Sequence, residues 1–456
     1  MPRVIIVGGG ISGLSTAYYL SKRGIPSTII EQRPRLGGVI QTERVEGCVV
    51  EAGPDSFISV KPAAMELIRE LGLAGEVIGS NDHLRKTWVR KRGRLVPLPD
   101  GLMMIVPTRV MPLAASRLLS WPTKIRMGLE LLKSPSPKTE DESVADFVRE
   151  HYGQEAVDYL AEPLLSGIYG GNPDALSVRA VLPRFVDLAT RHGSLTRGVL
   201  AERKAARRES SGMPLFRTMK GGLGQLVEAV TGATSGHMEW VRATAEAIEK
   251  SGNHYRVRAG GEWLETERVV LACEAHRAAP LAAGIDARIS ELLGGVAYSS
   301  SMTVALGFDE QAFPKPLDGF GFLVPRRERK RLIAATWVGT KFPHRVPPGT
   351  ALLRCFLGGM ENAAILEEQD EMVIAAVVEE LREIVPFTSG PRFARVYRWP
   401  RSMAQYTVGH PGRMAELESR MSRFPGMALA GNAYQGIGIP DCIRMGRSAA
   451  ERTAAL

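Results

Sequence analysis

The chain has 456 residues, of which 44% are hydrophobic and 23% charged, and these are the proportions of an ordinary globular protein with a sizeable core. No run of about 18 uninterrupted apolar residues occurs, which argues against a membrane span. The net charge of +9 is spread over several basic clusters without a nucleic-acid motif, so nucleic acid is not an expected partner.

The four cysteines are scattered, with no CxxC pair, which fits a reducing compartment and offers neither a zinc site nor a disulfide framework. The N-terminus lacks the layout of a signal peptide. We therefore expect a cytoplasmic protein without a bound metal. The basic clusters have two interpretations: a solvated surface, or a region that attracts a polyanionic small molecule, anionic lipid or an acidic partner.

The first 31 residues show the order strand, glycine turn, helix, strand and acid. The apolar run Arg3–Val7 leads directly into Gly8-Gly9-Gly10-Ile11-Ser12-Gly13. A helix-compatible segment, Leu14–Arg23, precedes a second apolar run, Ser27–Ile30, which closes on Glu31. This is the dinucleotide-binding fingerprint with its flanking elements, and it predicts that the chain binds an adenine dinucleotide.

Each part of the fingerprint has a physical role. Gly8 permits the tight turn, Gly10 lets the backbone approach a pyrophosphate, and Gly13 lets the helix pack against the sheet. Free N–H groups at the helix start receive phosphate charge. Glu31 is expected to accept hydrogen bonds from the ribose hydroxyls of the adenosine.

Two further glycine segments follow the acid. Gly37-Gly38 brings backbone close to the cofactor again, an arrangement that distinguishes FAD enzymes of the amine-oxidase and desaturase type from plain NAD dehydrogenases. Such enzymes often have an arginine directly after this pair, where this chain has Val39, so Arg35 becomes the candidate cation for the pyrophosphate. Gly53-Pro54-Asp55-Ser56 is by itself a turn signal.

Between residues 95 and 133, apolar residues alternate with arginines and lysines and are interrupted by Pro107, Pro112 and Pro122. The prolines predict short helices. Two interpretations stay open: a helical cap over an apolar site, and a surface that contacts a membrane from one side. Further helices are expected over 141–149, 154–165 and 179–188.

After residue 215 the pattern changes to strands. A hairpin is expected across Gly260-Gly261, and the run Val269–Ala272 is expected to rejoin the nucleotide-binding sheet. The chain ends in a strand (Met427–Ala430), a glycine-rich turn (Gly431–Asp441) and a helix (Cys442–Ala454), which again suit a phosphate or ring oxygen. Four more runs of strand length suggest a mixed or antiparallel sheet beside the substrate: 301–308, 320–325, 332–337 and 352–357.

These elements predict an α/β fold with three parts. A Rossmann-like FAD-binding domain is assembled from residues 1–90, 216–295 and 400–456. A helical insertion for substrate or membrane contact spans 95–215, and a substrate-binding sheet domain spans 296–399. FAD is favoured over NAD because two distant glycine turns serve the cofactor, and no second fingerprint for a nicotinamide occurs.

Together the motifs resemble one family closely, the soluble flavin-dependent porphyrinogen oxidases of haem synthesis, within the amine-oxidase-like FAD superfamily. The resemblance covers almost the whole chain, and its later motifs are not shared with amine oxidases. Besides the glycine segments already described, it rests on Glu162–Tyr169, Gly319–Phe322, Gln405–His410 and Gly436–Cys442.

The resemblance implies that Leu323 and Phe356 pack on the substrate macrocycle. A cation-rich entrance would suit the substrate's propionates, and Arg85, Lys86 and Arg90 lie close together in sequence. The FAD contacts that it implies are Gly8, Gly9, Gly10, Ile11, Ser12, Gly13, Glu31, Gly38, Gly53, Pro54, Asp55, Ser56, Ala245, Trp399, Ile437, Gly438 and Ile439.

The family oxidises either coproporphyrinogen III or protoporphyrinogen IX to the porphyrin. Eukaryotic members that use protoporphyrinogen typically have an arginine before an aromatic residue, beside the substrate's carboxylates, whereas here Thr87 precedes Trp88. A small hydroxyl residue there resembles the coproporphyrinogen-using branch of Gram-positive bacteria. The resemblance thus implies coproporphyrinogen III, with protoporphyrinogen IX as the alternative.

Forming a porphyrin removes six electrons, so a two-electron flavin must act three times, with hydride transfer to flavin N5 and oxygen as the acceptor giving peroxide. No constellation of side chains indicates a catalytic base, so no catalytic residue is predicted. Rival interpretations are an amine oxidase or carotenoid-type desaturase, and a flavin-carrying scaffold without activity. A downstream ferrochelatase and a membrane surface are candidate partners, and the oligomeric state is left open.

Overall fold

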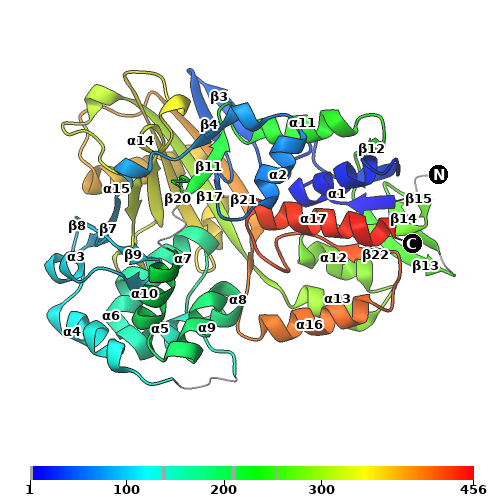
Figure 1. Ribbon diagram of the computed structural model, residues 1–456. Coiled ribbons are helices and arrows are strands. Elements are labelled where there is room, and N and C mark those ends of the chain that lie inside the picture. The colour runs from blue at the N-terminus through cyan, green and yellow to red at the C-terminus, as the bar shows by residue number, and fades with distance from the viewer. Residues whose placement is uncertain (1–3, 136–139, 207–211, 253, 456) are drawn as a thin grey trace. The chain divides into compact units, whose positions relative to one another are not determined.

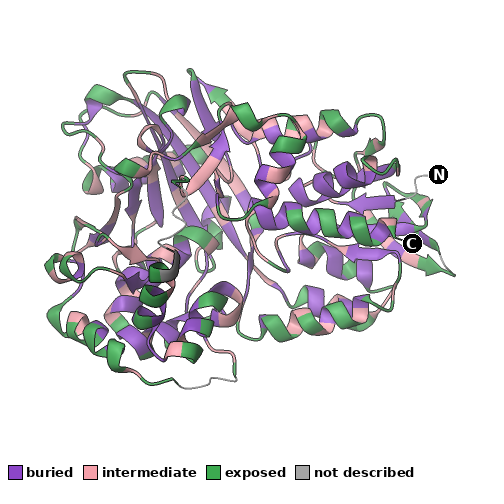
Figure 2. Cartoon of the chain, in the orientation of Figure 1, coloured by how far each residue is buried: buried purple, intermediate pink, exposed green. Residues whose placement is uncertain are grey.

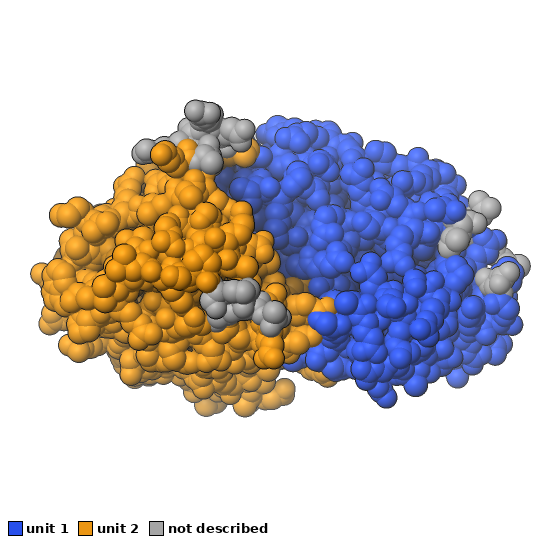
Figure 3. Space-filling view, turned by 60° about the horizontal axis from the view of Figure 1, so that its bottom comes forward, with its two compact units in different colours: residues 1–80, 214–297, 412–456 blue, residues 81–213, 298–411 orange. Residues whose placement is uncertain are grey.

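Figure 1 shows the computed structural model, which describes residues 4–135, 140–206, 212–252 and 254–455. The chain folds as two compact units, each assembled from separate stretches of sequence (Figure 3). Unit 1 contains residues 1–80, 214–297 and 412–456, and unit 2 contains residues 81–213 and 298–411.

The centre of unit 1 is a five-stranded parallel sheet. In spatial order its strands are β12 (Met238–Val241), β2 (Ser27–Ile30), β1 (Val4–Val7), β16 (Arg268–Leu271) and β22 (Met427–Leu429). The strands β1, β2 and β16 are buried along their whole length, as continuous apolar runs require in a sheet covered on both faces. The predicted return of residues 269–272 to this sheet is confirmed, because Ile5 pairs with Val269.

Helices α1 (Ile11–Ser21) and α17 (Ile439–Ala454) pack against each other, and Figure 1 shows the red helix beside the dark blue one. The contact is close because a glycine lies in it: an added Cβ on Gly446 would lie 2.4 Å from the carbonyl oxygen of Ser12. The hydroxyl of Thr16 also donates to the carbonyl oxygen of Gly446 at 3.1 Å. Two segments from opposite ends of the sequence are thereby joined within unit 1.

The other helices of unit 1 are α2 (Ala63–Glu70), η1 (Ala74–Glu76), α11 (Gly224–Thr234), α12 (Ala275–Ala282), α13 (Ala287–Gly294) and most of α16 (His410–Met421). Its smaller sheets are β3 (Thr42–Val45) with β4 (Cys48–Glu51), then β5 (Phe57–Ile58), β11 (Phe216–Met219) and β6 (Val77–Gly79), and then β13 (Ala245–Ser251), β14 (His254–Ala259) and β15 (Glu262–Thr266). The pair β14–β15 is the predicted hairpin across Gly260-Gly261.

Unit 2 is built on a seven-stranded mixed sheet, which confirms the mixed or antiparallel sheet expected from the apolar runs. The pair β18–β7 is parallel, and the pairs β17–β20, β20–β19, β19–β18 and β7–β8 are antiparallel. In spatial order the strands are β21 (Phe393–Gln405), β17 (Ala297–Asp309), β20 (Thr350–Gly359), β19 (Ala334–Trp337), β18 (Gly321–Leu323), β7 (Thr87–Lys91) and β8 (Arg94–Pro97).

One face of this sheet forms the hydrophobic core of unit 2. Phe322, Ala335 and Cys355 are at most 3% exposed, and they belong to one cluster with Val377 of α15 (Asp370–Ile384). Figure 2 shows these strands as buried. Because side chains alternate along a strand, the residues between these core residues point to the opposite face.

The helical part of unit 2 consists of η2 (Asp82–Leu84), α3 (Val110–Ala115), α4 (Trp121–Leu129), η3 (Glu130–Leu132), α5 (Val144–Tyr152), α6 (Gln154–Ala156), η4 (Val157–Ala161), α7 (Glu162–Tyr169), α8 (Val178–Val181), α9 (Pro183–His192) and α10 (Leu195–Ala206). The connections of the sheet contain η5 (Glu310–Ala312), η6 (Arg326–Glu328), α14 (Val338–Lys341), η7 (Pro343–Arg345) and η8 (Ala363–Glu367). Since η4 is π-helical and continuous with its neighbours, the predicted helix over 154–165 is one run with a π segment.

The expectation of short helices over 95–133 is wrong for its first part. Residues 95–107 form β8 and a small hairpin, β9 (Leu102–Met103) with β10 (Val106–Pro107). Pro97 and Pro107 end strands here, a position that proline tolerates, rather than starting helices. Because β7 and β8 extend the sheet formed by residues after 297, the helical span and the sheet share unit 2.

Candidate functional site

The glycine turn after β1 has the shape that a pyrophosphate needs. Gly8 has φ +110°, and an added Cβ there would lie 2.7 Å from the carbonyl oxygen of Ala272. An added Cβ on Gly13 would lie 2.0 Å from the carbonyl oxygen of Gly8, so α1 packs on the turn only without a side chain. Around Gly10 nothing lies within 4 Å of an added Cβ. Gly10 also caps α1 without a side-chain hydrogen bond, so the first N–H groups of the helix are available to an anion.

Glu31, directly after β2, is fixed beside this turn. Its Oε2 accepts a hydrogen bond from the N–H of Gly9 at 2.9 Å, and its Oε1 accepts one from the N–H of Arg33 at 2.9 Å. A carboxylate oxygen has two lone pairs, so each oxygen retains one for a ribose hydroxyl. The predicted ribose acid therefore lies against the predicted pyrophosphate turn.

Of the later glycine segments, one lies against the same turn and the next lies against the residue that follows it. An added Cβ on Gly38 would lie 3.0 Å from Cα of Gly10, and one on Gly53 would lie 2.1 Å from the carbonyl oxygen of Val39. Gly38 therefore lies against the fingerprint turn, and Gly53 lies against the residue directly after Gly38. The residues that continue from Gly53 are half-buried: Pro54, Asp55 and Ser56.

Arg35 folds back onto its own loop. Its guanidinium donates to the carbonyl oxygens of Leu36, Gly38 and Ile40 at 3.3, 2.7 and 3.0 Å. These bonds hold the left-handed Gly37-Gly38 turn, a conformation that leaves its carbonyls without partners in a helix or sheet. Arg35 therefore engages backbone carbonyls, and the first turn of α1 is a second source of positive potential beside the glycine turn.

The C-terminal glycine turn reaches the same corner of unit 1. Gly436 has φ +115°, and Gly438 caps α17 without a side-chain hydrogen bond. Cys442, in the first turn of α17, lies beside Ser12 in the first turn of α1; burial raises the pKa of its thiol, and Ser12 acts to lower it. The turn Ile437–Ile439 and the fingerprint turn therefore lie at the neighbouring N-terminal ends of two packed helices.

Two predicted cofactor contacts come from other elements. Ala245 begins β13 directly after Thr244, whose hydroxyl contacts Oε1 of Gln32 at 3.4 Å, one residue beyond Glu31. Trp399 is buried in β21 of unit 2, so its contact with the cofactor stays a prediction. The residues of unit 1 fit FAD, because they offer an open backbone cradle for a pyrophosphate and a fixed acid for a ribose.

Strand register places two predicted substrate residues on one row of the sheet of unit 2. Leu323 pairs with Ala334, which pairs with Phe356. Directly opposed residues point to the same face, and this face is opposite to the core face that carries Phe322. The helix α7 covers the row, because an added Cβ on Gly167 would lie 3.4 Å from Cδ2 of Leu323.

Thr87 shares this face. It opens β7 and pairs with Gly321, two residues before Leu323. The structure therefore brings Thr87, Leu323 and Phe356 together on one surface from three strands. Arg85 precedes the strand, and its side chain is exposed.

Lys86 and Arg90 are both engaged by neighbouring side chains. Nζ of Lys86 lies 4.0 Å from a ring centre of Trp88, which packs on the core, and 2.6 Å from a carboxylate oxygen of Asp318. Arg90 is 8% exposed, and its Nη1 lies 3.6 Å from the carboxylate of Glu380 on α15. The expectation of an entrance cation at Arg90 is wrong, because strand alternation turns it toward the core.

The basic segment 326–331 is neutralised residue by residue. Each of its five cations pairs with a different carboxylate, so the segment fixes the connection between β18 and β19 to three neighbouring helices and to the loops on either side of η8. This supports the interpretation of a structural, solvated cluster for this part of the basic charge. The pairs are Arg326–Glu361, Arg327–Asp158, Arg329–Glu162, Lys330–Glu383 and Arg331–Glu368.

Arg354 belongs to no motif of the sequence, but the structure places it beside the substrate row. It lies two residues before Phe356 on the same face, it is 2% exposed, and its guanidinium carbon lies 5.1 Å from the ring centre of Phe356. An arginine inside the otherwise apolar run Leu352–Leu357 is rare enough to have been a signal. It places a permanent positive charge beside the row of predicted substrate residues.

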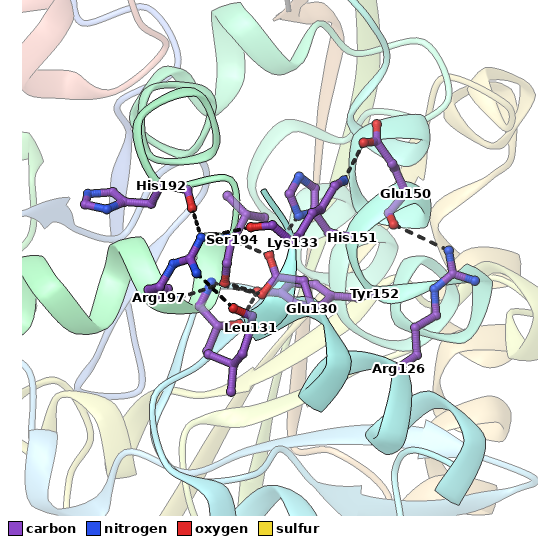
Figure 4. A network of polar contacts seen from close by, with 12 residues as sticks. Arg126, Glu130, Leu131, Lys133, Glu150, His151, Tyr152, His192, Ser194 and Arg197 are labelled. Carbon is purple, nitrogen blue, oxygen red and sulfur yellow. Dashed lines mark hydrogen bonds and ion pairs between the residues drawn. The ribbon is translucent and has the colours of Figure 1, made fainter. Parts of the chain in front are cut away.

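A carboxylate, a histidine and a serine also meet inside the helical part of unit 2, and Figure 4 shows Glu130 between His151 and Ser194. The hydroxyl of Ser194 donates to Glu130 at 2.7 Å rather than to the imidazole, so no activated nucleophile results. Glu130 instead accepts from the N–H of Leu195 at 2.6 Å and caps α10. All three side chains are at most 5% exposed, which makes the cluster structural.

Metal ligation and thiol chemistry find no support in the described residues. Among residues 4–135, 140–206, 212–252 and 254–455, no three or more His, Cys, Asp or Glu side chains are arranged so that they could hold a metal ion. Burial raises the pKa of Cys355 to about 12 and that of Cys442 to about 11. Both therefore remain protonated at neutral pH, the unreactive form of a thiol.

Comparisons with known proteins agree with this geometry. The model of a family described as flavin containing amine oxidoreductase matches residues 11–454. The chain is 34% identical to coproporphyrinogen III oxidase of Bacillus subtilis (strain 168), over 98% of this chain and 96% of that protein. It is 28% identical to chloroplastic protoporphyrinogen oxidase of Nicotiana tabacum, over 96% of this chain and 83% of that protein.

Among solved structures, a provisionally named protoporphyrinogen oxidase from Exiguobacterium sp. 255-15 superposes with a TM-score of 0.88 at 31% identity, with 98% of each chain covered. These matches confirm the resemblance expected from the motifs. The flavin in the family description confirms the expected cofactor class, and the adenine-dinucleotide fingerprint makes that flavin FAD.

Proposed function

The chain belongs to the flavin-containing amine oxidoreductase family, and we propose that it oxidises coproporphyrinogen III to coproporphyrin III with FAD and oxygen. The observation that carries the proposal is the similarity to a coproporphyrinogen III oxidase over 98% of the chain. The fold alone would not suffice, because related folds serve other substrates.

Thr87 and Arg354 support this choice of substrate. Thr87 shares a face with Leu323 and Phe356, at the position where the motif resemblance implies an arginine in eukaryotic protoporphyrinogen oxidases. Coproporphyrinogen has four propionates and protoporphyrinogen has two, so the former gains more from positive charge near this face. Arg354 supplies such a charge, and exposed Arg85 supplies a second one ahead of β7.

FAD, when bound, supplies the two-electron redox chemistry; three turns consume three molecules of oxygen and give three of hydrogen peroxide. The chain supplies binding and orientation. We assign the pyrophosphate to the first turn of α1, the ribose to Glu31, and the remaining contacts to Gly38, the 53–56 turn, Ala245, Trp399 and the 437–439 turn. Leu323 and Phe356 offer an apolar surface for the macrocycle. Pyrrole N–H protons leave to water, so no side-chain base is required.

The test compares oxidation of coproporphyrinogen III and protoporphyrinogen IX by the purified holoprotein, followed by porphyrin fluorescence. We expect kcat/KM to favour coproporphyrinogen by about tenfold or more. This is the effect expected if one of its extra propionates makes one additional charge-assisted contact with the protein. Equal or reversed preference would assign the alternative substrate, protoporphyrinogen IX. A panel of amines serves as the control, since amine turnover without porphyrin formation would indicate an amine oxidase.

We also propose peripheral membrane contact through an apolar stripe on α4 and η3. Trp121, Ile125, Leu129 and Leu132 recur at helical spacing and are 58% to 76% exposed. A cap over an internal site would bury these side chains, so their exposure favours the second interpretation of the 95–133 span. Among the helices of the described residues, none is long and apolar enough to cross a membrane.

The stripe is held in place from behind. Glu155 accepts hydrogen bonds from the N–H of Ser120 at 2.8 Å, from the hydroxyl of Thr123 at 2.7 Å and from Nζ of Lys91 at 2.9 Å. Burial alone would raise the pKa of Glu155, but these hydrogen bonds outweigh it and hold the pKa at about 2. Glu155 therefore stays ionised and anchors the N-terminus of α4 at any physiological pH.

Vesicles of phosphatidylglycerol and of phosphatidylcholine test this contact by co-sedimentation. We expect the holoprotein to bind the anionic vesicles, and the double variant Trp121→Glu and Ile125→Glu to lose binding. Trp263→Glu is the matched control, since Trp263 is an exposed tryptophan of unit 1. Binding that survives the double variant would remove the stripe from the proposal.

A cytoplasmic ferrochelatase is proposed as the recipient of the product, and co-elution of the two purified proteins tests it.

A further inference from the structure

A groove in unit 1, apart from the proposed cofactor and substrate residues, has the composition of a small-ligand site. It has a volume of about 270 Å³ and lies between α16 and α17, with Leu429 of β22 in its lining. Its floor is apolar, because Leu417, Met421 and Met445 are at most 5% exposed. Polar and exposed side chains form its rim.

The charges on that rim favour an anion. Arg444 and Arg452 are eight residues apart on α17, which is about 12 Å along the helix. Nη2 of Arg444 donates to the carbonyl oxygen of Gln435 at 2.9 Å. The guanidinium of Arg452 makes no hydrogen bond or ion pair with the residues that the structure describes. Glu418 is the single carboxylate in the lining, so the rim has a net positive charge.

The size of the groove decides what kind of ligand it takes. Twelve residues line it, whereas a stable protein interface uses roughly 20–30 residues a side. The volume of the groove lies just below the range of roughly 300–1,000 Å³ that is typical of sites for drug-sized ligands. The groove is therefore too small for a porphyrinogen. Met414, Met421 and Met445 are flexible side chains that adapt to an apolar body.

We propose that this groove binds a small amphipathic carboxylate, with its apolar chain or ring on the methionine floor and its carboxylate at Arg452. The proposal concerns a second ligand and does not depend on the oxidation of a porphyrinogen. An arginine and a carboxylate form a charge-assisted pair, and the apolar floor beside Arg452 adds burial of the ligand's apolar part.

Isothermal titration calorimetry on the holoprotein tests the proposal with decanoate as the probe. We expect saturable one-to-one binding of decanoate, and weaker binding of decanol and decylammonium, which share its chain but lack its charge. Arg452→Gln should weaken decanoate binding about tenfold. Arg447→Gln is the matched control, because Arg447 lies on the same helix but pairs with Glu66 and Glu451.

A second variant, Ser448→Trp, fills the groove from an exposed position of α17 and should abolish binding. Flavin content and melting temperature show that each variant is folded. Decanol that binds as tightly as decanoate, or decanoate affinity unchanged in both Arg452→Gln and Ser448→Trp, would overturn the proposal. Self-association that Ser448→Trp abolishes, without decanoate binding, would replace it with an interface between copies of this chain.

Discussion

The proposed cofactor site of unit 1 is lined by backbone atoms, whereas the substrate-facing surface of unit 2 is made of side chains. In unit 1 the space is lined by backbone, since Gly8 and Gly13 have no room for a Cβ while Gly10 faces open space. In unit 2 the surface consists of side chains, and Thr87, Leu323 and Phe356 meet only through strand register. A backbone-built site leaves a local signature in the sequence, whereas a side-chain-built site depends on how distant strands pair.

The largest effect on cofactor binding is expected from Gly13→Ala. The added methyl would lie 2.0 Å from the carbonyl oxygen of Gly8, so α1 must move away from the turn. Overpacking of this kind costs about 1–3 kcal/mol or more, and we expect complete loss of FAD with a lower melting temperature. Gly10→Ala is the matched variant, with no described atom within 4 Å of the methyl. Its apoprotein should unfold within about 0.5 kcal/mol of wild type, while FAD affinity falls because the methyl enters the cofactor's space.

Flavin-to-protein ratio and thermal unfolding of the two apoproteins distinguish these variants. If Gly13→Ala retained FAD, the turn would not be built on exclusion of side chains. If Gly10→Ala bound FAD normally, the open space would not be the pyrophosphate site.

In unit 2, Phe322 and Phe356 lie on opposite faces of the same sheet, so their alanine variants test which face is the core and which meets the substrate. Phe322→Ala removes a core side chain that is 1% exposed and should cost about 3–5 kcal/mol of unfolding free energy. Phe356→Ala, on the other face, should cost less stability but raise KM for coproporphyrinogen about tenfold. Urea unfolding and steady-state kinetics measure the two effects. Loss of substrate affinity in Phe322→Ala alone would reverse the assignment of the faces.

Glu130→Gln tests the buried network that holds the helical part of unit 2. Burial raises the pKa of Glu130, but hydrogen bonds from His151, Ser194, Thr196 and the N–H of Leu195 outweigh it, so its pKa is lowered. A lowered pKa means that its stability contribution is present above about pH 4.3, the ordinary value, and is lost as the pH falls through the folded value.

We expect Glu130→Gln to cost about 1–3 kcal/mol at pH 7, because it leaves buried donors without an acceptor. The loss should shrink below about pH 4 as the wild-type carboxylate is protonated. Urea unfolding of both proteins between pH 3 and pH 7 measures it, with cofactor content as the control for unit 1. A constant difference across this range would show that the charge of Glu130 is not what stabilises α10.

The smallest effect is expected from Lys86→Met. Lys86 pairs with Asp318 and stacks on Trp88 away from the substrate face, so KM should change by less than about twofold. Arg85→Met is the matched variant, because that exposed guanidinium precedes the face of Thr87. Steady-state kinetics at low and high salt compare the two. A tenfold or greater rise in KM for Lys86→Met would return this lysine to the substrate site.

Much of unit 1 could be predicted from the sequence because its signals are local. The glycine turns, Glu31 and the hairpin across Gly260-Gly261 each follow from a few adjacent residues. In unit 2, strand register determines which side chains share the substrate face, and proximity in sequence does not predict it. Arg90 lies three residues from Thr87 yet faces the core, whereas Arg354 lies far away in sequence and shares the substrate face.

The assembly of unit 1 from three stretches of chain determines when it can fold on the ribosome. The strand β22 and the helix α17, which complete the parallel sheet and cover α1, come from residues 427–454. At a synthesis rate of roughly 5–20 residues per second, the glycine fingerprint is made about 20–80 s before these partners. Until β22 is made, the edge of β16 that pairs with it has no partner strand, so we expect a chain truncated before β22 to expose that edge and to lack a stable cofactor site.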